Sequence, residues 1–289
     1  HLRRGVEMAG GRVSRAGWAS QPQYPVQIDW ENPDTRGLRF FYAGSMPVDL
    51  VTGQTATIVG GAAPRTVNAG QGAAIGPDIS GTSYLDFGTR ESWNTNRPMT
   101  LFWRGMLDGT TGAFRCPISK ANGNGGTTTP FDMQIDSATG AFVVTRSNVA
   151  FRQNVSTTTA TAGIVNSVCY VAETELCEGQ TYFYVNSATR ENGSSIDSGT
   201  GVPTANTNSL RIGRREDGGT QLDGAPEVTM LWGRALSTEE YGRVFRNPYS
   251  LLKSVRRRTG IIYGAGGAAF NPAWARGSNQ LIGSGLHVS

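Results

Sequence analysis

The sequence predicts an all-β sandwich followed by one short helix, with extended segments at both ends of the chain. Of the 289 residues, 39 are glycine, and clusters of Thr, Ser and Asn separate short apolar runs. Such a composition is typical of many strands joined by turns. A single all-β domain commonly occupies about 200 to 250 residues, so the chain is long enough for one.

The strands are indicated by short apolar or alternating runs. Two of them are separated by four residues ending in Gly140, which can adopt the positive φ that a tight hairpin requires. The expected strands are Met99–Leu107, Phe131–Asp136, Ala141–Thr145, Val168–Thr174 and Gln180–Asn186.

A last strand precedes the helix. Val228, Met230 and Trp232 alternate with Thr229 and Leu231, which predicts a half-buried strand. The next two residues, a glycine and an arginine, break this pattern.

The helix begins with the spacing of a capping box. Ser237 can accept a hydrogen bond from the backbone of Glu240, whose side chain reaches back to the backbone of Ser237. Leu236 and Tyr241 can form a hydrophobic staple over this cap. We expect the helix to end near Arg246, because the following residue precedes a proline.

Three segments in this order resemble one family. Gln180–Asn192 is similar to a strand and hairpin that usually reads L-Y-V-N-G, and the strand before R-A-L-S-x-E-E is similar to the family's last strand. Asn208–Val228 is similar to its I-G, loop, F-x-G-x-I-D-E-V segment, with Leu222 in place of the aromatic and Ala-Pro in place of Ile-Asp. Roughly residues 38–247 therefore resemble the concanavalin A-like, laminin-G-like jelly-roll domains. The resemblance implies a fold and leaves the function open.

The residue types argue against catalysis. The two histidines are His1 and His287, so a Ser-His-Asp or Cys-His site would depend on a chain end. Jelly-roll glucanases use carboxylates that alternate along one strand. The nearest case is Glu173 and Glu175, which we interpret as a solvated strand end that turns at Gly179. We therefore expect a protein that is not an enzyme.

No cofactor is expected either. Gly123–Gly126 lacks the Lys-Ser/Thr ending of a phosphate-binding loop and is interpreted as a flexible hairpin tip. The resemblance implies that a structural calcium ion is common in such domains. The acidic residues assign no site for it, because they are scattered over the sequence: Asp108, Asp132, Asp197, Asp217 and Asp223.

Aromatic residues leave two alternatives. Trp93, Tyr84 and Trp103 could contact a glycan from exposed positions. Sandwich cores also use aromatic side chains, and core packing is the favoured interpretation for each of the three.

The three cysteines are Cys116, Cys169 and Cys177. Their odd number and their spacing argue against a disulfide framework or a zinc site. We expect them to be small buried residues in a protein assembled in a reducing cytoplasm.

The chain is expected to divide into an extended N-terminal arm (residues 1–37), a jelly-roll domain (38–250) and an extended C-terminal arm (251–289). Prolines between Trp18 and Leu38 disfavour helical geometry there. The C-terminal arm carries aromatic residues on glycine-rich spacers. It can wrap its own domain or order on another subunit, and docking on a subunit is favoured.

The net charge is +4, and most of the excess lies in the arms. No aromatic nucleic-acid motif accompanies these arginines, so salt links to proteins are favoured over nucleic acid. No run is long and apolar enough to span a membrane, and the first residues lack the apolar core of a signal peptide. The candidate assembly contacts are Arg256, Arg257, Arg258, Phe270, Trp274 and Arg276.

The arms carry a second resemblance. Gln21–Leu38 (Q-P-Q-x-P-V-x-I-D-W-x-N-P-x-x-R-G-L) and Phe270–Asn279 (F-N-P-A-W-A-R-G-S-N) are similar to those of laminin-G-like proteins encoded by tailed bacteriophages. The resemblance implies a non-catalytic virion component, on head or tail, that is assembled in the host cytoplasm. Its expected partners are capsid or tail proteins and further copies of itself. The alternative is a module that binds bacterial surface glycan.

Overall fold

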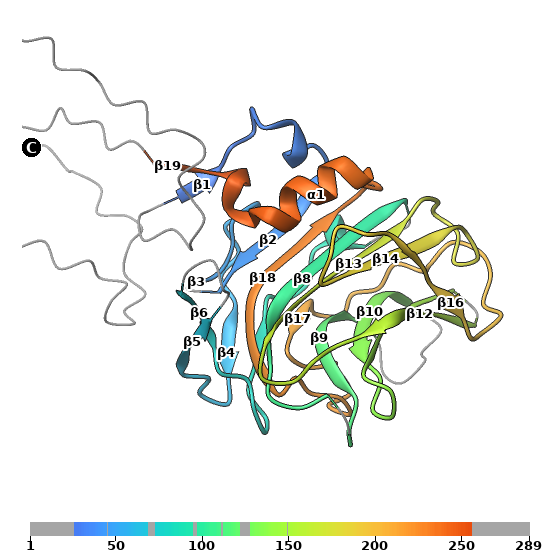
Figure 1. The fold of residues 1–289 in the computed structure, drawn as a ribbon, viewed down its shortest axis with the longest axis horizontal. Coiled ribbons are helices and arrows are strands. Elements are labelled where there is room, and N and C mark those ends of the chain that lie inside the picture. Colours follow the sequence, from blue (N-terminus) through green and yellow to red (C-terminus); the bar gives the residue numbers. More distant parts are fainter. Residues whose placement is uncertain are drawn as a thin grey trace, which may run out of the picture. The chain divides into compact units, whose positions relative to one another are not determined.

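The computed structural model describes residues 26–255, except 45, 69–72, 95–96, 111, 122–127 and 149. Two antiparallel sheets pack face to face as a sandwich (Figure 1). The seven-stranded sheet has the spatial order β15 (Glu191–Asn192), β14 (Thr181–Val185), β13 (Val165–Ala172), β8 (Met99–Leu107), β18 (Gly224–Trp232), β2 (Leu38–Ala43) and β3 (Met46–Asp49). The eight-stranded sheet has the order β16 (Ser194–Ser195), β12 (Phe151–Thr159), β11 (Ala141–Ser147), β10 (Thr129–Ile135), β9 (Arg115–Lys120), β17 (Arg211–Ile212), β7 (Tyr84–Asp86) and β4 (Thr57–Val59).

Smaller elements complete the fold. Two strand pairs lie outside the main sheets: β1 (Val26–Ile28) with β19 (Leu252–Ser254), and β5 (Pro64–Asn68) with β6 (Ala73–Pro77). The helices are α1 (Thr238–Arg246) and three short 3-10 turns, η1 (Pro33–Thr35), η2 (Glu91–Trp93) and η3 (Pro248–Leu251). The predicted all-β jelly-roll sandwich with one short helix is confirmed for the described residues.

The main core fills the space between the sheets. Phe40 of β2 meets Phe87 and Trp93 edge to face, with ring centroids 4.9 and 5.7 Å apart. Trp103 of β8 and Phe142 of β11 approach from opposite sheets to 6.5 Å. Each side chain of this size contributes about 2–3 kcal/mol when it is fully buried, so these aromatics hold the two sheets together.

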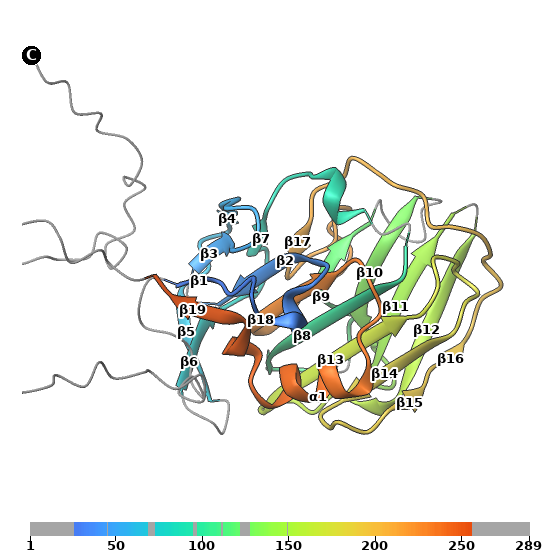
Figure 2. The same cartoon turned by 90° about the horizontal axis from the view of Figure 1, so that it is seen from above.

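A second apolar layer lies on the outer face of the seven-stranded sheet, where α1 covers it (Figures 1 and 2). Tyr241 of α1 stacks on Tyr184 of β14 with ring centroids 4.2 Å apart. Met230 and Trp232 of β18 belong to this layer, whereas Leu231 faces the main core. The prediction of a half-buried strand was therefore wrong: the face with Thr229 and Leu231, which alternation assigned to solvent, lies against the main core, and the helix covers the other face.

The start and end of α1 agree with the sequence. Ser237 and Glu240 form both hydrogen bonds of the capping box, and Arg234 pairs with both carboxylate oxygens of Glu240 at 2.7 and 2.8 Å. Leu236 and Tyr241 are both buried beside the cap. The helix ends at Arg246, as predicted.

The predicted strands differ from the observed ones mainly at their ends. β8 has the predicted bounds, and the hairpin between β10 and β11 turns at Gly140 with a φ of 75°. β13 begins at Val165 and ends at Ala172, so its predicted end at Thr174 was two residues too late. The chain bends directly after Ala172, where successive residues turn back toward β14.

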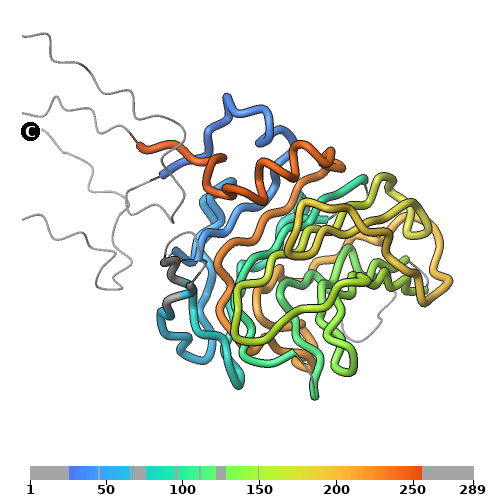
Figure 3. Tube along the Cα trace, viewed as in Figure 1, coloured from blue at the N-terminus to red at the C-terminus, as the bar shows by residue number. Residues whose placement is uncertain are grey.

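Both ends of the described chain meet in one strand pair. Val26 of β1 lies opposite Ser254 of β19, and the two segments run side by side in the Cα trace (Figure 3). Lys253 pairs with Asp29 at 3.2 Å. The predicted arm boundaries at residues 37 and 250 stay predictions. The proposed assembly contacts, from Arg256 to Arg276, lie outside the described residues.

Within the described part of the chain, no helix has the length and apolar character needed to cross a membrane.

Candidate functional site

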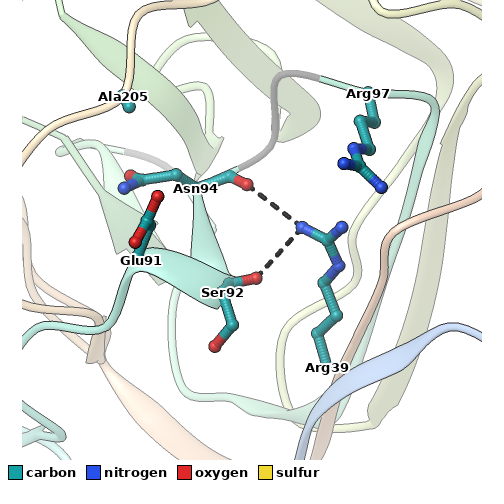
Figure 4. A pocket seen from close by; sticks show the side chains of 6 residues that line it. All are labelled: Arg39, Glu91, Ser92, Asn94, Arg97 and Ala205. Carbon is teal, nitrogen blue, oxygen red and sulfur yellow. Dashed lines mark hydrogen bonds between the residues drawn. The ribbon is translucent and has the colours of Figure 1, made fainter.

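A cavity of about 460 Å³ opens at one end of the sandwich (Figure 4). The start of β2, the end of β18 and the start of β8 lie at this end, because Leu38 pairs with Trp232 and Trp232 with Thr100. The segment after β7, which contains η2, and the long loop between β16 and β17 complete the rim. The cavity is lined by Arg39, Glu91, Ser92, Asn94, Arg97 and Ala205.

Hydrogen bonds fix both the side chain and the backbone of Arg39. Its Nη1 donates to the backbone carbonyls of Ser92 at 3.1 Å and of Asn94 at 3.2 Å. Its own carbonyl accepts a hydrogen bond from the indole of the buried Trp93 at 3.2 Å. Gly233 leaves room for the side chain, since a Cβ there would come within 2.1 Å of the Arg39 Nε. The guanidinium is therefore positioned before any ligand arrives.

The charge around Arg39 is not balanced locally. Burial lowers the pKa of Arg39, and the positive charge of Arg97 lowers this pKa further. A guanidinium remains charged at neutral pH even so. Among the described residues, no carboxylate lies within 4.0 Å of either guanidinium, and Glu91 lies on the opposite side of the cavity beside Asn94 (Figure 4).

A hydrogen-bond network fixes the loop beside the cavity. The Asn94 side chain donates to the carbonyl of Asn206 and accepts from its backbone N–H, both at 3.2 Å. The ammonium of Lys120 donates to the carbonyl of Asn208 at 2.6 Å. Burial lowers the pKa of Lys120 to about 8. No local pattern predicts that this lysine is buried, because the carbonyls that accept its hydrogen bonds come from a loop distant in the sequence.

A second polar group lies on the eight-stranded sheet, and its charges are paired internally. Arg215 lies 3.5 Å from Asp132 and 3.0 Å from Asp217. Burial raises the pKa of Asp132, although Arg215 acts in the opposite direction. Gln134 also donates to Asp132, so this carboxylate is engaged on several sides. The cavity is the better candidate because its two arginines form no ion pair with any carboxylate among the described residues.

A sequence model of the concanavalin A-like lectin/glucanases superfamily matches residues 80–240, which is more than half of the chain. The chain belongs to this superfamily. No curated protein matches the full sequence significantly.

Solved structures with the superfamily fold are similar at low sequence identity. Domain 4 of the extracellular arabinanase AbnA from Geobacillus stearothermophilus, in complex with arabinotriose, has a TM-score of 0.53 at 12% identity, and the match covers 72% of this chain and 97% of that one. The binding domain of Paraclostridial Mosquitocidal Protein 1 has a TM-score of 0.51 at 13% identity, with 73% and 52% covered. At these identities the likeness shows the fold alone.

Of the three aromatic residues considered as glycan contacts, two are buried in the core and one is partly exposed. Trp93 and Trp103 are fully buried in the main core, which confirms core packing for both. Tyr84 is partly exposed on β7 and lies under two guanidiniums, those of Arg211 at 5.1 Å and Arg214 at 5.4 Å. For Tyr84 the core interpretation was wrong, because its side chain points away from the sandwich interior.

The two carboxylates considered for hydrolysis do not share a strand. β13 ends at Ala172, so Glu173 and Glu175 lie in the bend that follows, which confirms the interpretation as a strand end. Glu173 accepts a hydrogen bond from the Tyr182 hydroxyl. An alternating pair of catalytic carboxylates therefore has no strand to occupy here.

Several of the acidic residues considered as calcium ligands form ion pairs with arginines instead. Asp108 pairs with Arg65, and Asp223 lies 3.4 Å from Arg115. Within the described residues, no group of three or more His, Cys, Asp or Glu side chains could hold a metal ion. The three cysteines are free and buried, as expected for small core residues: Cys116, Cys169 and Cys177. The glycine run at residues 123–126 lies outside the described residues.

Proposed function

We propose that this protein is a non-catalytic phage virion component, in which terminal segments anchor a laminin-G-like domain that is displayed outward. The pairing of Val26 with Ser254 carries the proposal, because it brings both ends of the described chain, to which the terminal segments are attached, to one place on the domain. The resemblance of both arms to phage proteins supports it. In this proposal the protein assembles in the host cytoplasm and contacts capsid or tail proteins and further copies of itself.

A common exit point is mechanically suited to anchoring. Two tethers attached at one point fix one end of the sandwich, while the loops at other places remain accessible. The ion pair of Asp34 with Arg243, at 2.6 Å, links η1 to α1 and reinforces this region. Partly buried ion pairs of bidentate geometry are firmer than exposed ones.

The test is incorporation into purified particles. Three chains are compared in phage that lack the native copy: the full chain, a chain that ends at Arg258, and a chain without residues 1–25. We expect the full chain in particles and a strong reduction of one or both truncated chains, although all three fold. Equal incorporation of the three would contradict anchoring by the arms.

A second function is glycan binding, which is compatible with the first. The cavity favours it, because charged and polar groups converge there from β2, η2 and neighbouring loops. A domain of the same fold is solved with arabinotriose, which supports the proposal by analogy of fold. Saturable binding of surface polysaccharide from the host, measured by calorimetry, is the expected result. Binding that is unchanged after Arg39→Gln would exclude the cavity.

A further inference from the structure

We infer that the cavity binds an acidic saccharide, with a sugar carboxylate held between Arg39 and Arg97. The inference rests on the glycan-binding function proposed above and specifies its ligand class. The argument has three parts: the charge of the cavity, the direction of its donors, and the polar groups that remain for sugar hydroxyls.

The first part is charge. Arg39 and Arg97 direct their guanidiniums toward one another at one side of the cavity, and no carboxylate of the described residues pairs with either (Figure 4). Other arginines of the sandwich do face acids, such as Arg104 with Glu227 at 3.0 Å and Arg211 with Asp86 at 2.9 Å. Two facing cations without an acid repel each other, and a bound anion would turn this repulsion into attraction.

The second part is direction. The Nη1 of Arg39 is already used by the carbonyls of Ser92 and Asn94, which fixes the plane of the group. Its other terminal nitrogen faces Arg97 (Figure 4). A carboxylate between the two groups can accept from both, and charge-assisted bonds of this kind are about twice as strong as neutral ones. Arg39 itself loses little side-chain freedom on binding, because it is held in advance.

The third part is the remaining lining. The Glu91 carboxylate and the Ser92 hydroxyl make no side-chain hydrogen bonds within the described part of the chain, and both line the cavity. A carboxylate accepts from sugar hydroxyls, and a hydroxyl both donates and accepts. The volume of about 460 Å³ lies within the usual range of small-molecule sites. The cavity therefore offers a cationic end for the acid and an acidic end for hydroxyl groups.

The experiment compares two ligands that differ in charge. A galacturonic acid trisaccharide and a galactose trisaccharide are titrated against the full chain by calorimetry at low salt. We expect the acidic ligand to bind at least about tenfold tighter and to weaken as salt is added. Sodium sulfate is titrated alone as a third probe, and we expect it to bind more weakly than the acidic trisaccharide.

Three variants accompany the titrations. Arg39→Gln and Arg97→Gln are expected to reduce binding of the acidic ligand about tenfold and to leave the neutral ligand nearly unchanged. Arg246→Gln is the matched control, since it removes the same charge from an exposed position on α1. Arg97 is exposed, so its variant keeps the test valid if Arg39→Gln disturbs η2.

The failures are distinguishable. If both trisaccharides bind equally, the inferred carboxylate site is wrong and glycan binding stands. If neither trisaccharide binds, both the carboxylate site and the proposed glycan-binding function are wrong. If sulfate binds as tightly as the acidic trisaccharide, the cavity is a general anion site and the saccharide assignment is overturned.

Discussion

Gly224, the first residue of β18, has a backbone conformation and a neighbour that both require glycine. Its φ is +151°, and a Cβ would lie 2.1 Å from the carbonyl oxygen of Met106. We expect Gly224→Ala to lower the free energy of unfolding by about 3 kcal/mol, because the backbone of β8 cannot move aside easily. Urea denaturation measures the change. Gly53→Ala is the control, since its φ is +74° but nothing lies within 4 Å, and we expect a loss of about 1 kcal/mol.

Lys120 gives the molecule an unusual pH dependence. The pKa of its ammonium is about 8 in the folded protein because of burial, against 10.5 for an ordinary lysine. The unfolded chain therefore binds more protons between these values, and the free energy of unfolding rises as pH increases from about 8 to 10.5. Lys120→Met removes this titration. Between pH 7 and 10, we expect the free energy of unfolding of the wild type to rise by on the order of 2 kcal/mol relative to that of the variant, as measured by urea denaturation. A constant difference across this range would contradict a lowered pKa.

At the scale of elements, the cap of α1 is the clearest local determinant. Ser237→Ala removes the hydrogen bond that the Ser237 hydroxyl accepts from the backbone N–H of Glu240. We expect this to lower the free energy of unfolding by about 1 kcal/mol. Ser137→Ala is a suitable control, because the hydroxyl of Ser137 makes no hydrogen bond within the described residues. Thermal unfolding of both variants tests the difference, and equal midpoints would mean that the cap does not limit stability.

Elements with local causes could be predicted, and those with distant causes could not. The capping box of α1 and the bounds of β8 depend on neighbouring residues, so the sequence predicted both. β17, two residues long, exists because β7 and β9 flank it. The outer face of β18 is likewise buried by a distant cause, because α1, which follows β18 in the sequence, packs against it. Very short strands and second layers leave little trace in alternation.

The cavity escaped prediction for the same reason. Arg39 and Arg97 are 58 positions apart, and Ala205 comes from a loop further along the chain. None of the three belongs to a recognisable motif in its own segment. The topology of the two sheets brings them to one end of the sandwich, and local sequence patterns do not contain this information.

The whole molecule is closed by the pairing of its described ends, which gives the last prediction. β19 buries Leu252, pairs with β1 and places Lys253 beside Asp29. A chain that ends at Leu251 loses all three contributions, whereas a chain that ends at Val255 keeps them. We expect the shorter chain to be less stable by about 3 kcal/mol, since a buried leucine and several backbone hydrogen bonds disappear together.

Urea denaturation followed by tryptophan fluorescence compares the two chains, which differ by four residues. The same pair separates closure from anchoring. If the chain ending at Val255 is as stable as the full chain but is absent from particles, the residues beyond it serve assembly and the strand pair serves folding. Equal stability of the two truncated chains would show that β1 is held by η1 and α1 alone, and the common exit of both terminal segments would then lose its structural basis.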